Sequence, residues 1–107
     1  MFERFHAHIY YDKRSRGTAE RVRRELGENF RVVLGRWHDK PVGPHPRSMY
    51  QVAFEADQFE GLTQWLMANR GGLTVFLHPE TGDDLSDHRD RALWMGRILK
   101  LDLSVLE

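Results

Sequence analysis

The feature that most constrains the fold of this chain is the order in which strand-like and helix-like hydrophobic patterns follow one another. Residues that alternate between apolar and polar indicate strands, and apolar residues three or four positions apart indicate helices. The patterns predict strands at residues 4–11, 30–36, 48–54 and 73–78 and helices at residues 13–27 and 57–69. This β-α-β-β-α-β order is typical of the ferredoxin-like split βαβ arrangement. With right-handed crossovers it predicts an α+β fold in which two helices cover one face of an antiparallel four-stranded sheet.

The C-terminal part of the chain adds two further predicted elements. Residues 87–95 are predicted to form a short helix, and apolar residues at period two between Ile98 and Leu106 predict a last strand. A chain of 107 residues fits one domain. We therefore expect residues 1–107 to form a single ferredoxin-like domain that carries this helix and strand as an extension.

Composition excludes several functional classes. Sixteen basic and sixteen acidic residues cancel, which leaves no global charge for binding nucleic acid or an anionic membrane. Cysteine is absent, so a disulfide, a thiolate nucleophile and a cysteine-based metal site are excluded. Without an apolar run long enough for a membrane span, or a signal-peptide pattern, we expect a cytoplasmic protein. Any metal site must use histidine and carboxylate ligands, which suit Fe(II), Mn(II) or Zn(II).

The first predicted strand carries two histidines on one face. Strict alternation sends Phe5 and Ile9 toward the helices and sends His6, His8 and Tyr10 to the opposite face. The two imidazoles stand about 7 Å apart along the strand, so both can point into one small volume. Polar groups on this face are the first functional signal in the chain.

Two other elements should bring histidines to this strand. In the usual strand order the fourth strand runs antiparallel to the first, so His78 should approach His6. The loop at residues 37–47 contains three prolines, which exclude a helix and make it stiff. It carries His38 and His45, and His45 has its backbone fixed between two prolines. The loop is long enough to fold back over the histidine face.

Each of these side chains also has a simpler structural interpretation. A strand histidine is more often half-buried and hydrogen-bonded than a ligand, and for His6 and His8 beside His78 the two interpretations stay equally open. His38 and His88 stand next to carboxylates and are interpreted as surface pairs. Aromatic residues on this face either stack on a substrate ring or form core or a dimer interface. A second subunit, the C-terminal strand and loops, or a ligand must cover the face, and we expect a homodimer.

A family resemblance rests on four stretches, which are His6–Asp12, Pro41–Pro46, Leu77–Gly82, and Asp87–His88 followed by Ala92–Gly96. Together, and in this order, they resemble the DOPA 4,5-dioxygenase family of small extradiol dioxygenases, over nearly the whole chain. The His-x-His strand, Gly-Pro-His-Pro and His-Pro-x-Thr-Gly are specific in combination. The resemblance implies iron(II)-dependent insertion of O₂ beside the hydroxyl pair of a catechol such as L-DOPA, which opens the ring to a semialdehyde.

Motif position and strand geometry together predict roles for eight residues. The predicted site residues are the metal ligands His8, His45 and His78, the acid/base or ligand-supporting groups His6 and His38, and the substrate-binding aromatics Tyr10, Trp37 and Phe76. His6 is an alternative to His8 as a ligand. The expected metal is Fe(II), and another divalent ion such as Zn(II) is an alternative in the isolated protein. Carboxylates that could orient the imidazoles are Asp12, Asp39, Glu80 and Asp87.

Two other functional classes remain open at the level of sequence. One is a non-catalytic dimer on the same fold that binds a metal or a small molecule, because ferredoxin-like folds host many functions. The other is a metal-free oxygenase that uses histidines and aromatic residues alone. Metal content and oxygen consumption separate these classes.

Overall fold

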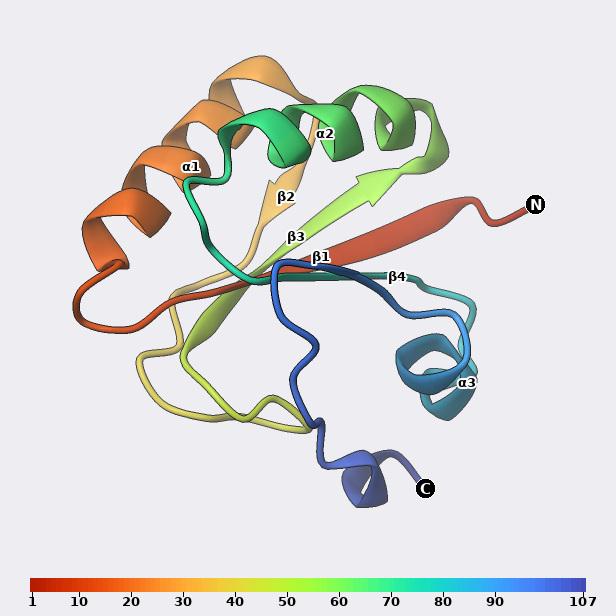
Figure 1. Ribbon diagram of the computed structural model, residues 1–107. Coiled ribbons are helices and arrows are strands. Elements are labelled where there is room, and N and C mark those ends of the chain that lie inside the picture. The colour runs from red at the N-terminus through yellow and green to blue at the C-terminus, as the bar shows by residue number, and fades with distance from the viewer.

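The computed structural model describes all 107 residues and contains one five-stranded antiparallel sheet in the order β2-β3-β1-β4-β5 (Figure 1). The strands are β1 (Arg4–Tyr10), β2 (Val33–Leu34), β3 (Met49–Glu55), β4 (Val75–Pro79) and β5 (Leu93–Met95). The helices are α1 (Arg16–Asn29), α2 (Ala56–Asn69), α3 (Asp84–Arg89) and the short 3₁₀ helix η1 (Leu103–Leu106). No helix combines the length and the apolar character needed to cross a lipid bilayer.

The two long helices lie side by side on one face of the sheet, as the pattern predicts (Figure 1). Their apolar stripes pack on the residues of β1, β3 and β4 that point toward them. The buried members of this core include Ala19, Val22 and Leu26 of α1, Leu62 and Leu66 of α2, and Phe5, Ala7, Ile9, Tyr50, Val52, Phe54, Val75 and Leu77 of the sheet. The predicted α+β architecture and the helix-covered face are confirmed, while the predicted four-stranded sheet is wrong, because β5 pairs with β4 and adds a fifth strand.

The position of β1 between β3 and β4 is also as predicted. In the antiparallel register, His6 stands opposite His78 on β4, and His8 stands opposite Phe76 on β4 and Gln51 on β3. Because side chains alternate along a strand, His6 and His8 share the face away from α1 and α2. The register therefore determines which histidines meet.

The prediction for the C-terminal elements is wrong in its boundaries. The short helix covers Asp84–Arg89 instead of residues 87–95, because the Asp83 carboxylate accepts a hydrogen bond from Ser86 N–H and caps the helix earlier. The last strand is β5 at Leu93–Met95, and Ile98 to Leu106 contains no strand. Gly96, at φ 84°, ends β5 in a conformation that glycine adopts without a Cβ penalty.

The period-two leucines after β5 cover the second face of the sheet without joining it. Leu99 and Leu101 pack on a small buried cluster formed by Tyr10, Met49 and Phe76. The Asp102 N–H then donates to the Pro44 carbonyl oxygen at 2.9 Å, which ties this segment to the loop between β2 and β3. A segment that packs on a sheet face can show the same alternation as a strand, so the pattern alone could not separate the two.

A buried carboxylate holds α3 against the turn that follows β4. Asp87 is fully buried and accepts hydrogen bonds from the Thr81 N–H at 2.8 Å and from the Thr81 hydroxyl at 2.9 Å. Arg91 donates to the same carboxylate at 2.9 Å. Burial opposes ionisation, but these hydrogen bonds outweigh it and lower the pKa of Asp87. The position of α3 therefore depends on one satisfied, ionised side chain.

We predict that Asp87→Ala lowers the free energy of unfolding by roughly 2–4 kcal/mol, because the Thr81 N–H and Arg91 lose their common acceptor. Asp90→Ala, at the end of the same helix, is the matched control, since Asp90 is exposed and pairs only with its neighbour Arg89. Urea denaturation of both variants measures the difference. Equal midpoints for the two variants would contradict this role of Asp87.

Candidate metal centre

Five of the six histidines gather on the sheet face opposite the long helices. His6 and His8 come from β1, His78 from β4, His45 from the loop between β2 and β3, and His88 from α3. The shortest separations between ring centroids are 4.1 Å for His78 and His88 and 4.2 Å for His8 and His45. Elements far apart in sequence thus converge on one polar volume.

The histidines form two groups that share His8. In one group the ligand atoms of His6, His8 and His78 lie within 4.8 Å of one another, and in the other those of His8, His45 and His88 do. Neither group contains a carboxylate. Neither group contains all three predicted metal ligands, since His8 meets His78 in the first group and His45 in the second.

Backbone carbonyl groups fix the orientation of two imidazoles. The Nδ1–H of His78 donates to the Pro79 carbonyl oxygen at 2.7 Å, and the Nδ1–H of His88 donates to the Asp84 carbonyl oxygen at the same distance. A carbonyl oxygen only accepts, so both Nδ1 atoms carry the proton. In the neutral form of each ring the Nε2 atom then has a free lone pair, the state that binds a metal.

A buried tyrosine holds the third imidazole. The hydroxyl oxygen of Tyr10 lies 2.6 Å from Nδ1 of His45. When Nδ1 carries the proton and donates to this oxygen, Nε2 of His45 is left as a ligand atom. Burial raises the pKa of Tyr10, so its hydroxyl stays neutral and is a hydrogen-bond partner only.

Burial keeps the imidazoles uncharged. His8, His45 and His78 are only 3%, 6% and 1% exposed. Burial lowers the pKa of His45 and of His78 to about 4, and it lowers the pKa of His8 well below its ordinary value with a further contribution from neighbouring histidines. Neutral imidazoles are the metal-binding form, so the centre needs no deprotonation at neutral pH.

The closest contact in the centre fits a divalent metal ion. Nε2 of His8 lies 3.0 Å from Nε2 of His78, and two nitrogens each about 2.1 Å from one ion at a right angle are separated by the same distance. Nδ1 of His8 is buried and has no hydrogen-bond partner. A bare His8–His78 hydrogen bond leaves that Nδ1 as an unsatisfied acceptor. With a metal ion on Nε2, the proton of His8 would sit on Nδ1, so that atom lacks a partner in either state, and the observation that favours a metal ion is the facing pair of Nε2 atoms.

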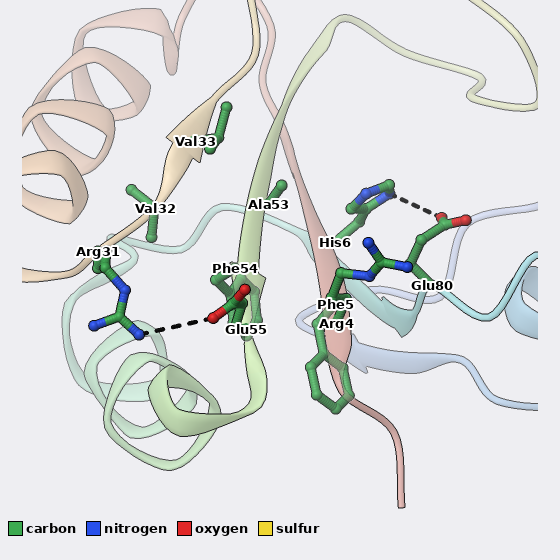
Figure 2. Close-up of a pocket in the computed structure, with 10 residues that line it drawn as sticks. All are labelled: Arg4, Phe5, His6, Arg31, Val32, Val33, Ala53, Phe54, Glu55 and Glu80. Carbon is green, nitrogen blue, oxygen red and sulfur yellow. Dashed lines mark ion pairs between the residues drawn. The ribbon is translucent and has the colours of Figure 1, made fainter.

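His6 stands at the edge of the centre and is half-buried. Its Nδ1 lies 3.4 Å from a carboxylate oxygen of Glu80, the pair joined by a dashed line in Figure 2. Burial lowers the pKa of His6, and the charge of Glu80 partly opposes that change. His6 and Glu80 also line an open cavity of about 590 Å³ on the sheet face (Figure 2). Of the five clustered histidines, only His6 lines this cavity.

The predicted aromatic residues fall on both sides of the sheet. Phe76 is fully buried behind the histidines, with its ring centroid 5.0 Å from that of His78 and 4.5 Å from that of Trp94. Trp37 packs on the helix side, 4.9 Å from the ring of Tyr50, and Arg16 lies 4.2 Å above its ring. The structure brings Tyr10 and Phe76 to the histidines and does not bring Trp37 there.

His38 is outside both histidine groups. Its backbone pairs with Met49, and its carbonyl oxygen accepts a hydrogen bond from the Tyr11 hydroxyl at 2.9 Å. Of the carboxylates expected to orient imidazoles, only Glu80 contacts one. Asp12 hydrogen-bonds Ser15, Asp39 binds Tyr11, and Asp87 binds Thr81 and Arg91.

The sequence interpretation missed His88 as a member of the cluster. The available signal was the Asp87–His88 pair at the start of the predicted short helix, which was interpreted as a surface pair. The earlier start of α3, at Asp84, places His88 one turn into the helix, where its Nδ1 reaches the Asp84 carbonyl. The capping residue Asp83 therefore decides where His88 points.

We predict that the metal-free protein loses stability as the pH falls from about 6.5 to about 4. In this window the unfolded histidines, at pKa 6.5, take up protons that buried His45 and His78, at pKa about 4, cannot accept. Each residue contributes up to about 3 kcal/mol, which is fully present above pH 6.5 and lost progressively below it. Urea midpoints measured from pH 7.5 to 4 should flatten in a His45→Gln/His78→Gln variant. An identical pH profile in that variant would contradict the assignment.

Comparisons with known proteins identify the family and several relatives of this chain. A model of the Dopa 4,5-dioxygenase family matches residues 5–105. The chain is 31% identical to the DOPA 4,5-dioxygenase of Amanita muscaria over 112 residues, which cover 95% of this chain and 49% of that protein. It is 37% identical to an uncharacterized 21.2 kDa protein of Botryotinia fuckeliana, over 96% of this chain and 63% of that one. The chain thus spans less than two thirds of either curated relative.

A solved structure of a related protein has the same fold as this chain. The crystal structure of a "putative dioxygenase" from Nostoc punctiforme superimposes with a TM-score of 0.97 at 54% sequence identity, covering 98% of this chain and 91% of that one. The family match over residues 5–105 confirms the resemblance seen in the four histidine-bearing stretches. The chain belongs to the Dopa 4,5-dioxygenase family.

Proposed function

We propose that this protein is a non-haem Fe(II) extradiol dioxygenase that opens the ring of L-DOPA or a related catechol. The observation that carries the proposal is the pair of buried, neutral imidazoles of His8 and His78, whose Nε2 atoms lie 3.0 Å apart. Family membership supplies the reaction class. The reaction would insert both atoms of O₂ into the catechol and cleave one carbon–carbon bond beside the hydroxyl pair, leaving a carboxylic acid and an aldehyde.

The proposed metal ligands are His8, His45 and His78. His88 is a further candidate, since its ligand atom lies within 4.8 Å of those of His8 and His45. When bound, Fe(II) would bring the catechol and O₂ together and favour the ionised catechol. The protein's own contribution is to hold the imidazoles neutral, through burial, and correctly oriented, through Pro79, Asp84 and Tyr10.

His6 is the proposed acid/base group, because it is half-buried and lines the cavity through which a substrate would approach. Its Nδ1 faces Glu80, so its other nitrogen is available to accept a proton from a catechol hydroxyl and to return it to the product. The contrast with fully buried His8 supports the division in which His8 binds metal and His6 transfers protons. An acid/base role for His38 remains a prediction.

Phe76 and Tyr10 are proposed to form the inner wall of the substrate site, where they contact the ligands. Phe76 stacks on His8 at a ring separation of 5.6 Å, and Tyr10 orients His45. A role for Trp37 in binding the substrate ring remains a prediction and is not needed by this arrangement. Homodimerisation and a cytoplasmic location also remain predictions, and sedimentation equilibrium would test the former.

We predict that the purified protein, reconstituted with Fe(II) without oxygen, binds about one iron per chain, and that His78→Ala and His45→Ala lose it. His88→Gln should weaken iron binding by about 10-fold or more, because His88 shares the second histidine group with His8 and His45. His38→Gln, outside both histidine groups, is the control that should retain iron. Iron measured by mass spectrometry after gel filtration distinguishes these variants. Full iron retention by His78→Ala would contradict the proposed ligand set.

We also predict that iron-loaded protein mixed with O₂ and L-DOPA consumes one O₂ per catechol and forms a yellow ring-opened product. His6→Gln should retain its iron and lose most of its turnover, because the proton acceptor is missing. An oxygen electrode and visible absorbance record the reaction. An iron-loaded protein that binds catechol and never consumes O₂ would show a non-catalytic binding protein, and turnover without metal would show a metal-free oxygenase.

A further inference from the structure

The cavity next to His6 lies where part of the histidine-bearing sheet face is left uncovered. It spans β2, β3 and β1 at the sheet end where β1 begins and β3 ends (Figure 2). Val33 and Ala53 supply apolar surface, and Val33 is 72% exposed. His6 and Glu80 form its boundary with the metal centre. A planar ring entering between His6 and the metal would leave its substituent in this cavity.

Four charged side chains line the cavity, and three of them have partners. Arg31 pairs with Asp57 and approaches Glu55 at 4.0 Å, the second dashed line in Figure 2. Glu80 faces His6 at 3.4 Å. The remaining charge is the guanidinium of Arg4, which forms no ion pair and no side-chain hydrogen bond in the structure. Figure 2 shows it on the same side of the cavity as His6 and Glu80.

The register of β1 places Arg4 in line with the metal centre. Arg4 precedes His6 by two residues and His8 by four, so all three side chains project from the same face of the strand. Each two-residue step is about 7 Å, which puts the base of Arg4 one step from the acid/base group and two steps from the ligand His8. A substituted ring held at the metal would therefore present its side chain toward Arg4.

We propose that Arg4 binds a carboxylate on the side chain of the substrate and so determines that the enzyme prefers catechols bearing an acidic side chain. This inference rests on the proposed function, because it assumes that the catechol binds beside His8. A guanidinium recognises a carboxylate with two parallel hydrogen bonds. Both carboxylates of the cavity already have partners, since Glu55 faces Arg31 and Glu80 faces His6. The only charged group left to bind a substrate is the Arg4 cation, which attracts a carboxylate and repels an ammonium group.

The test uses Zn(II)-loaded protein, in which binding is measured without turnover. Isothermal titration compares 3-(3,4-dihydroxyphenyl)propionate with the neutral 4-ethylcatechol and the cationic dopamine. We expect the propionate to bind about 10-fold more tightly than 4-ethylcatechol, and Arg4→Gln to remove that difference while the affinity for 4-ethylcatechol stays the same. Arg4→Lys should retain part of the difference in affinity between the propionate and 4-ethylcatechol. Arg31 lies on the opposite wall and pairs with Asp57, so Arg31→Gln should retain the whole difference in affinity.

The outcomes separate this inference from the proposed function. Equal affinity for the propionate in the wild type and in Arg4→Gln overturns the role of Arg4. A larger loss of propionate affinity in Arg31→Gln than in Arg4→Gln overturns it as well. So does a protein that binds none of the three catechols. The same series run with Fe(II) and O₂ should show the Arg4→Gln effect in KM rather than in kcat. If binding of the propionate depends on Arg4 and no oxygen is consumed, the inference about the carboxylate site stands and the proposed dioxygenase activity is wrong.

Discussion

The hydrogen-bonded register of β1 between β3 and β4 is the constraint on which the rest of the structure depends. It sets His6 opposite His78 and His8 opposite Phe76, and it sends Phe5 and Ile9 into the helix-covered core. A shift of one residue would turn every side chain to the other face of the sheet. The same ladder therefore forms the core and positions His6, His8 and His78, so the sheet holds three of the five clustered imidazoles, while the other two come from the β2–β3 loop and from α3.

Burying several imidazoles together is unfavourable unless each ring is neutral and its nitrogens are satisfied. The carbonyl oxygens of Pro79 and Asp84 and the hydroxyl of Tyr10 each satisfy one ring nitrogen, the Nδ1 of His78, of His88 and of His45. His8 is the exception, with one buried nitrogen unpartnered. Both histidine groups lack a carboxylate, so a divalent ion held there would keep its full charge and could offset an ionised catechol.

Much of the architecture could be predicted from the sequence because periodicity reports which side of an element is buried. The helix-covered face follows from it, and the strand order with the approach of His78 to His6 follows from the β-α-β-β-α-β order of the elements. The inclusion of His88 and the exclusion of His38 do not, since they depend on where α3 begins and on how a proline-rich loop folds back. Those outcomes are set by single contacts, such as the cap at Asp83, that leave no periodic signal.

The link between Asp102 and Pro44 joins the last segment of the chain to the loop that carries His45. The histidines themselves extend from residue 6 to residue 88, and the residues that cover the floor of the cluster follow at 99 and 101. No stretch of the chain shorter than residues 6–88 therefore contains all five imidazoles of the cluster. The cluster assembles only when distant parts of the chain fold together, and a metal ion held there would bind the folded protein.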